Sequence, residues 1–400
     1  MPRIALLTNC IPPYHKPVFD ALASHYGREN FRILLSTPME SNRSWRLEWE
    51  DLDVVVQKTV TVRGRWRHPR GFSESIQVHF PLDTISQLKR FSPDVVISTE
   101  LGFRSLSAVA YTKLHRRSRA ILWTEVNRST EQGRGLARKT IRKVLARHAH
   151  GFLALGEGGM RYIRSLGAPA HKVFELLYTT DVRRFSISSL RRSALSNQPP
   201  DMEKRLLYAG QLIERKGLLP FTTALKRWAA KNPDRRIELT FAGDGPLREM
   251  LEAAAPPANL RFEFLGNVSY EDLPEVYAKA GVLVFPTLAD TWGVVVNEAL
   301  AAGLPVLGST YSQAVKQLVV DGKDGWTFRA DQPEEMYAAI DRCLSTPADR
   351  LQAMRAEAQR TAMELTPVRV ASMIQAAIES CLNSSNGQSS VEQEVCVSRF

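Results

Sequence analysis

The sequence lacks the two glycine-rich motifs that most often mark a phosphate-binding α/β protein. The first apolar segment runs into TNCIPPYHKP, where a dinucleotide-binding protein would carry GxGxxG, and no GxxxxGK[ST] occurs anywhere in the 400 residues. These absences argue against an ordinary dehydrogenase and against a P-loop NTPase.

Cysteine is scarce, and long apolar runs are missing. The four cysteines have neither the spacing of a metal site nor that of a disulfide framework, which favours a reducing compartment. No segment approaches the length of a membrane span. We expect the apolar start IALLTN to be a first strand rather than a signal peptide, because Cys10, Pro12 and Pro13 follow it directly. The composition predicts a cytoplasmic globular protein, peripheral at most on the cytoplasmic membrane face.

Charge is divided unevenly along the chain. Residues 1–180 carry 28 Lys and Arg against 15 Asp and Glu, a net charge of +13, whereas residues 181–400 carry 25 against 27, a net charge of −2. A basic half predicts an anionic partner, and phospholipid, a phosphorylated lipid carrier and nucleic acid all fit that description.

The stretch GRGLARKTIRKVLARHAH concentrates this positive charge, with six Lys and Arg between residues 134 and 147. Helical periodicity places five side chains on one face: Ala137, Ile141, Val144, Leu145 and His148. Such a helix either packs its apolar face on the domain and leaves its charges solvated, or lies against anionic lipid. Packing on the domain is the commoner use, while the cluster RGRWRHPR at 63–70 favours the second.

Two successive runs of alternating strands and helices indicate two domains. RIALLTN, FRILLS, DVVISTE, RAILWTE and GFLALG are typical strands of the first run, and RLLYAGQ, RIELTFAGDG, RFEFLGN, GVLVFPT and PVLGST of the second. The rhythm predicts parallel sheets, with a ligand held in the cleft between their carboxyl edges. The predicted organisation is a first domain, a linker, a second domain, a closing helix and a disordered tail, over residues 1–185, 186–203, 204–366, 367–384 and 385–400.

Two loops of the second run have the composition of ligand sites. In LLYAGQLIERKGL, a strand ends in a Gly-Gln turn and Lys216 opens the next helix, so that an ammonium and free N–H groups could hold a phosphate. In FAGDGPLREM, glycines on both sides of Asp244 let the backbone approach a flat ligand. Each loop taken alone is also compatible with a solvated lysine or with a turn and helix cap.

The stretch ADTWGVVVNEALAAGLPV carries the strongest signal. A strand ends near Pro286, so that the N–H groups of Trp292, Gly293 and Val294 would lie at a helix N-terminus, where they favour a phosphate. Asp290 and Glu298 would bracket that anion site. Carboxylates beside a phosphate suit a ligand that also offers hydroxyls on both sides of its diphosphate, as a nucleotide sugar does. A cap and a solvated helix residue are the alternative, which explains Glu298 poorly.

With these motifs, AGQLIERKG, AGDGP, FLGNV, DTWGVVVNEALAAGLPV and DGKDGW, the sequence resembles the family 4 retaining glycosyltransferases. The resemblance extends to about residue 382 and is strongest over 204–328. The segment YTTDVRRF at 178–185 also resembles the one by which that family passes between domains. It implies an α/β protein of GT-B architecture, with two Rossmann-like parallel-sheet domains facing a central cleft. It also implies a reaction without a metal ion. A DxD-like triplet, Asp51-Leu52-Asp53, precedes its strand instead of following one, and we interpret it as a solvated loop.

The resemblance assigns roles to individual residues. Asp290 would contact hydroxyls of the transferred sugar, Glu298 would bind the ribose hydroxyls, and Lys216 would neutralise the diphosphate. Gly266-Asn267-Val268 matches the segment beside the base, which makes Val268 a candidate contact.

The sequence also departs from the family pattern. The first acidic residue of the pair is Asp instead of the usual Glu. Gln211 replaces an expected arginine, for which Arg215 could compensate, and Asn9 begins a loop that lacks the usual glycines. Glu125 follows a central strand where many members have histidine, and is a candidate base or hydroxyl anchor. A buried carboxylate paired with an arginine is the alternative for Glu125.

The predicted function is therefore transfer of a sugar, with retained configuration, from a nucleotide sugar to an acceptor hydroxyl. A UDP-sugar is the favoured donor and no cofactor is expected. The predicted acceptor is a saccharide or lipid-linked saccharide of surface polysaccharide or glycolipid biosynthesis. An anionic membrane surface stays open as a partner, and nucleic acid is not expected. Two alternatives remain: a non-catalytic nucleotide-sugar-binding subunit, and an epimerase or phosphorylase on the same fold.

Overall fold

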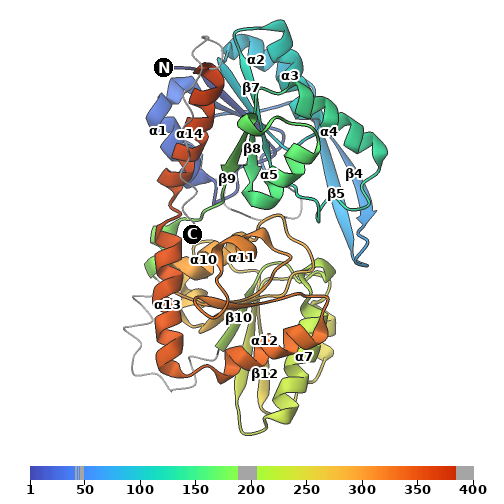
Figure 1. The fold of residues 1–400 in the computed structure, drawn as a ribbon, viewed down its shortest axis with the longest axis vertical. Helices are drawn as coiled ribbons and strands as arrows, with labels where there is room; N and C mark the ends of the chain where they lie inside the picture. The colour runs from blue at the N-terminus through green and yellow to red at the C-terminus, as the bar shows by residue number, and fades with distance from the viewer. Residues whose placement is uncertain (41–42, 44, 46–48, 188–204, 384–400) are drawn as a thin grey trace. The chain divides into compact units, whose positions relative to one another are not determined.

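The computed structural model describes residues 1–40, 43, 45, 49–187 and 205–383 (Figure 1). The chain divides into a first unit, Met1–Tyr178 joined by the segment from Pro367, and a second unit, Thr179–Thr366. The boundary lies at Tyr178 instead of the predicted residue 185. The reason is local packing, because the ring of Phe185 lies 5.7 Å from Tyr270 and 5.4 Å from Tyr277, both in the second unit.

The first unit contains a parallel sheet of seven strands in the order β3-β2-β1-β6-β7-β8-β9. Strands β1, β6 and β8 are buried at every position, as expected of parallel strands with helices on both faces. The strands are β1 (Ile4–Thr8), β2 (Phe31–Leu35), β3 (Asp53–Val56), β6 (Val95–Thr99), β7 (Arg119–Thr124), β8 (Gly151–Leu155) and β9 (Val173–Leu176). A separate antiparallel hairpin consists of β4 (Thr59–Arg67) and β5 (Ser73–Pro81).

The helices of the first unit connect these strands. They are α1 (Lys16–Tyr26), α2 (Thr84–Phe91), α3 (Phe103–Leu114), α4 (Leu136–His148) and α5 (Gly156–Ser165), with short 3-10 turns at Arg28–Asn30 and Ala170–Lys172. The predicted closing helix is α14 (Pro367–Asn383), and it packs on the first unit, against α1 and strands β7 to β9 (Figure 1). The predicted tail 385–400, and the predicted linker 186–203 beyond its first two residues, lie outside the described residues.

The second unit repeats the design with six parallel strands in the order β12-β11-β10-β13-β14-β15. They are β10 (Arg205–Ala209), β11 (Ile237–Ala242), β12 (Leu260–Gly266), β13 (Val282–Phe285), β14 (Val306–Ser309) and β15 (Gly325–Phe328). The helices are α7 (Leu218–Lys231), α8 (Arg248–Ala253), α9 (Leu273–Ala278), α10 (Val294–Ala301), α11 (Gln313–Leu318), α12 (Pro333–Ser345) and α13 (Ala348–Met363), with a 3-10 turn, η4, at Glu214–Lys216.

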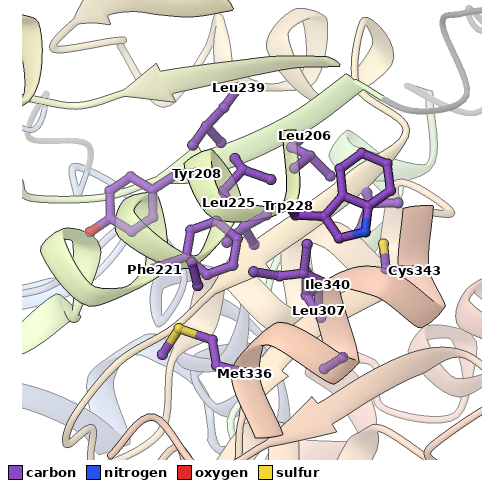
Figure 2. Packing of buried hydrophobic residues seen from close by; sticks show 14 of the residues in the cluster. Leu206, Tyr208, Phe221, Leu225, Trp228, Leu239, Leu307, Met336, Ile340 and Cys343 are labelled. Atoms are coloured by element: carbon purple, nitrogen blue, oxygen red, sulfur yellow. The ribbon is translucent and has the colours of Figure 1, made fainter. Parts of the chain in front are cut away.

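The core of the second unit lies between its sheet and the helices α7 and α12 (Figure 2). Phe221, Leu225 and Trp228 of α7 are buried together with Ile340 of α12. Trp228 keeps its indole N–H satisfied by donating to Asp341 Oδ1 at 2.8 Å, as a buried indole requires. This packing fixes the strand ends from which the site loops emerge.

The described part of the chain contains neither a metal-ligand cluster nor a membrane-spanning helix. Within the described ranges, no group of three or more His, Cys, Asp and Glu side chains is placed to hold a metal ion. Asp53 of the DxD-like triplet forms an ion pair with Arg32 at 2.8 Å. Among the helices of the described part of the chain, none is both long enough and apolar enough to cross a bilayer.

Candidate functional site

The second unit brings Lys216 and Asp290 together at the point where its strand order reverses. Lys216 follows β10 and Asp290 follows β13, and these neighbouring strands send their connections to opposite sides of the sheet. A crevice for ligands forms at such a point in open α/β sheets. Lys216 Nζ donates to Asp290 Oδ2 at 2.6 Å, and Arg215 Nη1 lies 3.2 Å from the same oxygen.

Backbone contacts hold the two loops in register. The carbonyl of Arg215 accepts hydrogen bonds from Leu288 N at 2.8 Å and from Thr287 Oγ1 at 3.2 Å. Gly217 has a φ of 67° and lies so close to the Pro286 carbonyl that a Cβ there would collide with it. The cationic turn η4 is therefore docked directly on the segment that carries Asp290.

The electrostatic setting of Asp290 keeps it ionised. Burial raises the pKa of this carboxyl, but the charges of Lys216 and Arg215 and their hydrogen bonds outweigh burial and lower the pKa to about 2. Arg215 also donates to the Ala289 carbonyl at 2.8 Å, which orients its guanidinium beside the carboxylate. The result is a partly buried cluster of two cations and one anion, with a net positive charge.

The N-terminus of α10 lies just beyond Asp290, as predicted. Gly293 has a φ of 105°, and a Cβ at this position would lie 2.5 Å from Phe285 Cε1, so the turn requires glycine. Residues 293–295 are partly accessible, and no side chain among the described residues caps this helix. The first N–H groups of α10 are thus available to an anion. Trp292 itself is buried, and its indole donates to Asn297 Oδ1 at 2.7 Å.

Glu298 lies one turn into α10 and has the opposite electrostatic character to Asp290. It is 5% exposed and accepts a hydrogen bond from the Tyr277 hydroxyl at 2.8 Å. Burial raises the pKa of Glu298 to about 7, although the bond from Tyr277 opposes the shift. Burial and the nearby Glu298 also raise the pKa of Tyr277, so that this hydroxyl remains a donor. The solvated helix residue considered as an alternative is not what the structure contains.

The remaining predicted residues of the second unit lie in the neighbouring loops. The Gln211 carbonyl accepts from the Tyr208 hydroxyl at 2.7 Å, and Leu212 N donates to the Asp244 carbonyl at 2.9 Å, which joins the two glycine turns. Asp244 Oδ1 accepts a hydrogen bond from Gly245 N at 2.7 Å, and Asp244 Oδ2 lies 3.4 Å from Arg248 Nη1. The carboxylate of Asp244 therefore stabilises its own turn. Val268 follows β12 and is half-buried.

The first unit has a reversal point of its own, between β1 and β6, and Asn9 lies there. Arg104, which is fully buried, donates from Nη1 to Asn9 Oδ1 at 2.5 Å and to Ser36 Oγ at 2.9 Å. Asn9 in turn donates to Glu40 Oε1 at 3.1 Å. Asn9 is thus held rigidly by a buried cation that sequence reasoning missed.

Glu125 follows β7 and is bonded to a tyrosine. The Tyr178 hydroxyl donates to Glu125 Oε1 and accepts from Trp123 Nε1 at 3.2 Å. Burial and the adjacent Glu125 raise the pKa of Tyr178, which keeps it a donor. His15 packs with its ring 4.7 Å from that of Tyr178, and burial lowers the pKa of His15 to about 3, so it is neutral. Glu125 therefore lies beside a buried aromatic cluster.

The predicted site residues divide between the two units. Asn9 and Glu125 belong to the first unit, and the other candidates belong to the second. Sequence reasoning missed Arg104, Tyr178 and Tyr277, each of which bonds to a predicted residue. Only Tyr178 carried a signal, because it begins the YTTDVRRF segment of the family resemblance.

Solved structures with this arrangement share the GT-B fold. The structure of Anabaena HepE in complex with UDP matches with a TM-score of 0.71 at 17% identity, over 94% of this chain and 100% of that chain. Sucrose-phosphate synthase from Thermosynechococcus elongatus matches with a TM-score of 0.69 at 14% identity, over 96% and 100%. The protein therefore has the predicted α/β GT-B fold, with two Rossmann-like units.

Sequence comparisons find similarity in the second unit. Residues 203–346 match the family model of the glycosyl transferases group 1. The chain is 29% identical over 147 residues to an uncharacterized glycosyltransferase of Methanocaldococcus jannaschii, covering 36% of this chain and 37% of that protein. It is 28% identical over 159 residues to a sulfoquinovosyl transferase of Arabidopsis thaliana, covering 40% and 29%. The chain spans less than half the length of these relatives, and the similarity to the group 1 glycosyl transferases is carried by residues 203–346.

Proposed function

We propose that the protein is a retaining glycosyltransferase that moves a sugar from a nucleotide-sugar donor to an acceptor hydroxyl. The observation that carries the proposal is the site of the second unit, where Lys216, Asp290 and the uncapped N-terminus of α10 meet at the strand-order reversal. The match of residues 203–346 to the family model of the group 1 glycosyl transferases supports it. A UDP-sugar is the favoured donor, since the neighbouring HepE structures contain UDP, UDP with glucose, and UDP-glucose.

The chemistry follows from where charge develops. As the bond to the anomeric carbon breaks, negative charge accumulates on the departing diphosphate, where Lys216 and the first N–H groups of α10 stabilise it. We propose that the acceptor hydroxyl attacks from the face that the diphosphate leaves, and that a leaving phosphate oxygen takes the acceptor proton. This cationic loop and helix terminus would replace a divalent ion, so the proposed reaction needs no metal.

The two carboxylates would bind opposite ends of the donor. We assign Glu298 to the ribose hydroxyls and Asp290 to hydroxyls of the transferred sugar. The acceptor side, to which we assign Asn9 and Glu125, belongs to the first unit. A saccharide or lipid-linked saccharide of surface polysaccharide or glycolipid biosynthesis is the acceptor class we propose. A Campylobacter jejuni relative, 27% identical over 145 residues, is named for transfer to an undecaprenol-linked saccharide.

A panel of donors tests the proposal. Purified protein is incubated with radiolabelled UDP-, GDP- and ADP-sugars, with and without a chelator, and the release of sugar and the product's anomeric configuration are measured. We expect turnover of one UDP-sugar that survives chelation and retains the configuration. Binding without transfer or hydrolysis would favour a non-catalytic binding subunit, an altered sugar would indicate an epimerase, and inversion or strict manganese dependence would overturn the mechanism.

A further inference from the structure

Helix α4 is attached to the first unit by a face other than the predicted apolar one. Arg142, Leu145 and Ala146 are buried, and Arg142 forms an ion pair with Glu131 and donates to the Tyr162 hydroxyl at 2.8 Å. A buried, paired arginine and two small or aliphatic side chains therefore anchor the helix. Of the predicted apolar face, only Leu145 is buried, which corrects the expectation that this face packs on the domain.

The outward half of α4 is amphipathic along its length. One edge consists of residues spaced by three or four positions, Ala137, Ile141, Val144 and His148, and all four are exposed. Ile141 is 40% exposed, Val144 is 45% exposed, and Leu136 at the helix start is 82% exposed. The other edge consists of the exposed cations Lys139, Lys143 and Arg147, and α4 contains no acidic residue.

The β4–β5 hairpin extends this surface. Val60 and Val62 are each 52% exposed, and Val62 pairs directly with Val78, which is 38% exposed, so three valines share one face of the ribbon. The other face presents exposed arginines at alternate positions, Arg63, Arg65 and Arg67. The hairpin thus presents exposed aliphatic side chains on one face and a row of cations on the other, whereas on α4 both kinds of side chain lie on the outward half.

Contacts at the hairpin tip join it to the segment that leads into α4. The guanidinium of Arg134 lies 3.9 Å from the ring centroid of Trp66, and His68 Nε2 is 3.0 Å from the Ser129 carbonyl oxygen. An isolated two-stranded ribbon is marginally stable, so these contacts matter for its placement. Figure 1 shows α4 and the hairpin on the same side of the first unit.

We propose that the exposed edges of α4 and the β4–β5 hairpin form a docking surface for an anionic lipid bilayer. The aliphatic side chains would enter the boundary between headgroups and acyl chains, while the lysines and arginines would contact lipid phosphates. The net charge of +13 over residues 1–180 attracts the chain to such a bilayer. Exposed aliphatic side chains beside the cations distinguish this surface from a nucleic-acid site, which combines cations with aromatic stacking platforms.

Vesicle flotation tests the proposal without any turnover. The full chain is mixed with vesicles of phosphatidylcholine alone or with phosphatidylglycerol, at low and at physiological salt. Two double variants separate the aliphatic contribution from the charge contribution. One combines Ile141→Ser with Val144→Ser, and the other combines Lys139→Gln with Lys143→Gln. The matched controls on the same unit are Val368→Ser, at a valine that is 68% exposed on α14, and Arg116→Gln with Arg117→Gln, at two exposed arginines.

We expect the wild-type chain and both controls to float only with anionic vesicles, more weakly at high salt. Each α4 variant should bind at least about tenfold more weakly, because two cations near the lipid phosphates are lost in one variant and aliphatic insertion is lost in the other. All the altered side chains are exposed, so thermal melts should be unchanged.

Four results would overturn the inference. These are no flotation at low salt, a serine variant that binds like the wild type, tighter binding to a single-stranded nucleic acid than to the vesicles, or a dimer in sedimentation velocity that the serine variant abolishes. UDP binding is measured by calorimetry on the same samples. If vesicle binding fails, the proposed donor chemistry still stands, and if UDP binding fails, the proposed lipid surface still stands.

Discussion

Lys216 Nζ and Asp290 Oδ2 lie 2.6 Å apart although the two residues are 74 positions apart in the chain. Before a donor binds, the lysine that we assign to the diphosphate is therefore neutralised by the carboxylate that we assign to the sugar. A diphosphate entering this site would compete with Asp290 for Lys216 and Arg215. Under these assignments, donor binding would release a carboxylate that can then accept a bond from a sugar hydroxyl.

Replacing Lys216 with alanine should slow transfer far more than it weakens nucleoside binding. The ammonium acts on charge that develops on the leaving group, so we expect kcat to fall about a hundredfold. Uridine affinity, measured by calorimetry, should stay within twofold of wild type. The control is Lys231→Ala, at an exposed lysine on α7. Equal losses of kcat and of uridine affinity would identify Lys216 as a structural residue.

Asp290→Asn should separate nucleotide binding from transfer. The variant no longer competes with a diphosphate for Lys216 and Arg215, so we expect UDP to bind as tightly as to wild type or several-fold more tightly. Transfer should fall, and discrimination among UDP-sugars should weaken. Asp349→Asn, at an exposed aspartate on α13, is the control. A severe loss of UDP affinity in Asp290→Asn would contradict the assignment of this residue to the sugar.

The stability of the protein should carry a pH signature from Glu298. The native carboxyl has a pKa of about 7 against an ordinary value of 4.5, so between these values the native state holds a proton that the unfolded state has lost. Stability due to this group is complete below pH 4.5, falls as the pH rises, and is constant above 7. The total loss is about 3 kcal/mol.

Denaturant titrations of wild type and Glu298→Gln check this signature. The variant should match wild type near pH 4.5 and be the more stable protein at pH 8, because a neutral amide escapes the cost of burying the charge. Glu249→Gln, at an exposed glutamate on α8, should follow wild type at every pH. A constant difference between Glu298→Gln and wild type across this range would show that Glu298 does not titrate there.

Nucleoside binding should respond to the same proton. If ribose hydroxyls donate to the ionised carboxylate, wild-type affinity for uridine should rise as the pH increases through about 7. Glu298→Gln should bind more weakly at pH 8, by about 1 to 3 kcal/mol, with no pH dependence. Uridine is the probe because it lacks phosphates that titrate nearby. Unchanged affinity in the variant would remove Glu298 from the nucleotide site.

Tyr178→Phe tests the acceptor role of Glu125. The substitution removes the donor to Glu125 and the acceptor for Trp123 Nε1, which leaves a buried indole N–H without this partner and costs about 1 to 3 kcal/mol of stability. We expect transfer to fall at unchanged UDP affinity, as it should also in Glu125→Gln. Normal transfer in both variants would make this pair a structural hydrogen bond.

The sequence by itself determined the features that depend on local patterns. Apolar runs of strand length, such as IALLT and VVIST, predicted the central parallel strands, because buried strands have no polar face. The order of motifs predicted the GT-B fold and the helix N-terminus beyond Asp290. Helical periodicity indicated that this helix starts near Gly293 or Val294, and the structure adds that the turn at Gly293 requires glycine.

Only the tertiary structure decided which distant side chains meet. The Lys216–Asp290 ion pair depends on β10 and β13 being neighbours, and the bond from Tyr277 to Glu298 joins helices α9 and α10, whose contact no periodicity reveals. The same limit applies to α4. Its sequence contains an apolar edge, and helical spacing locates that edge, but burial of Arg142 against Glu131 turned the edge toward solvent. Spacing along a helix defines its faces, and the partners supplied by the rest of the chain determine which face is buried.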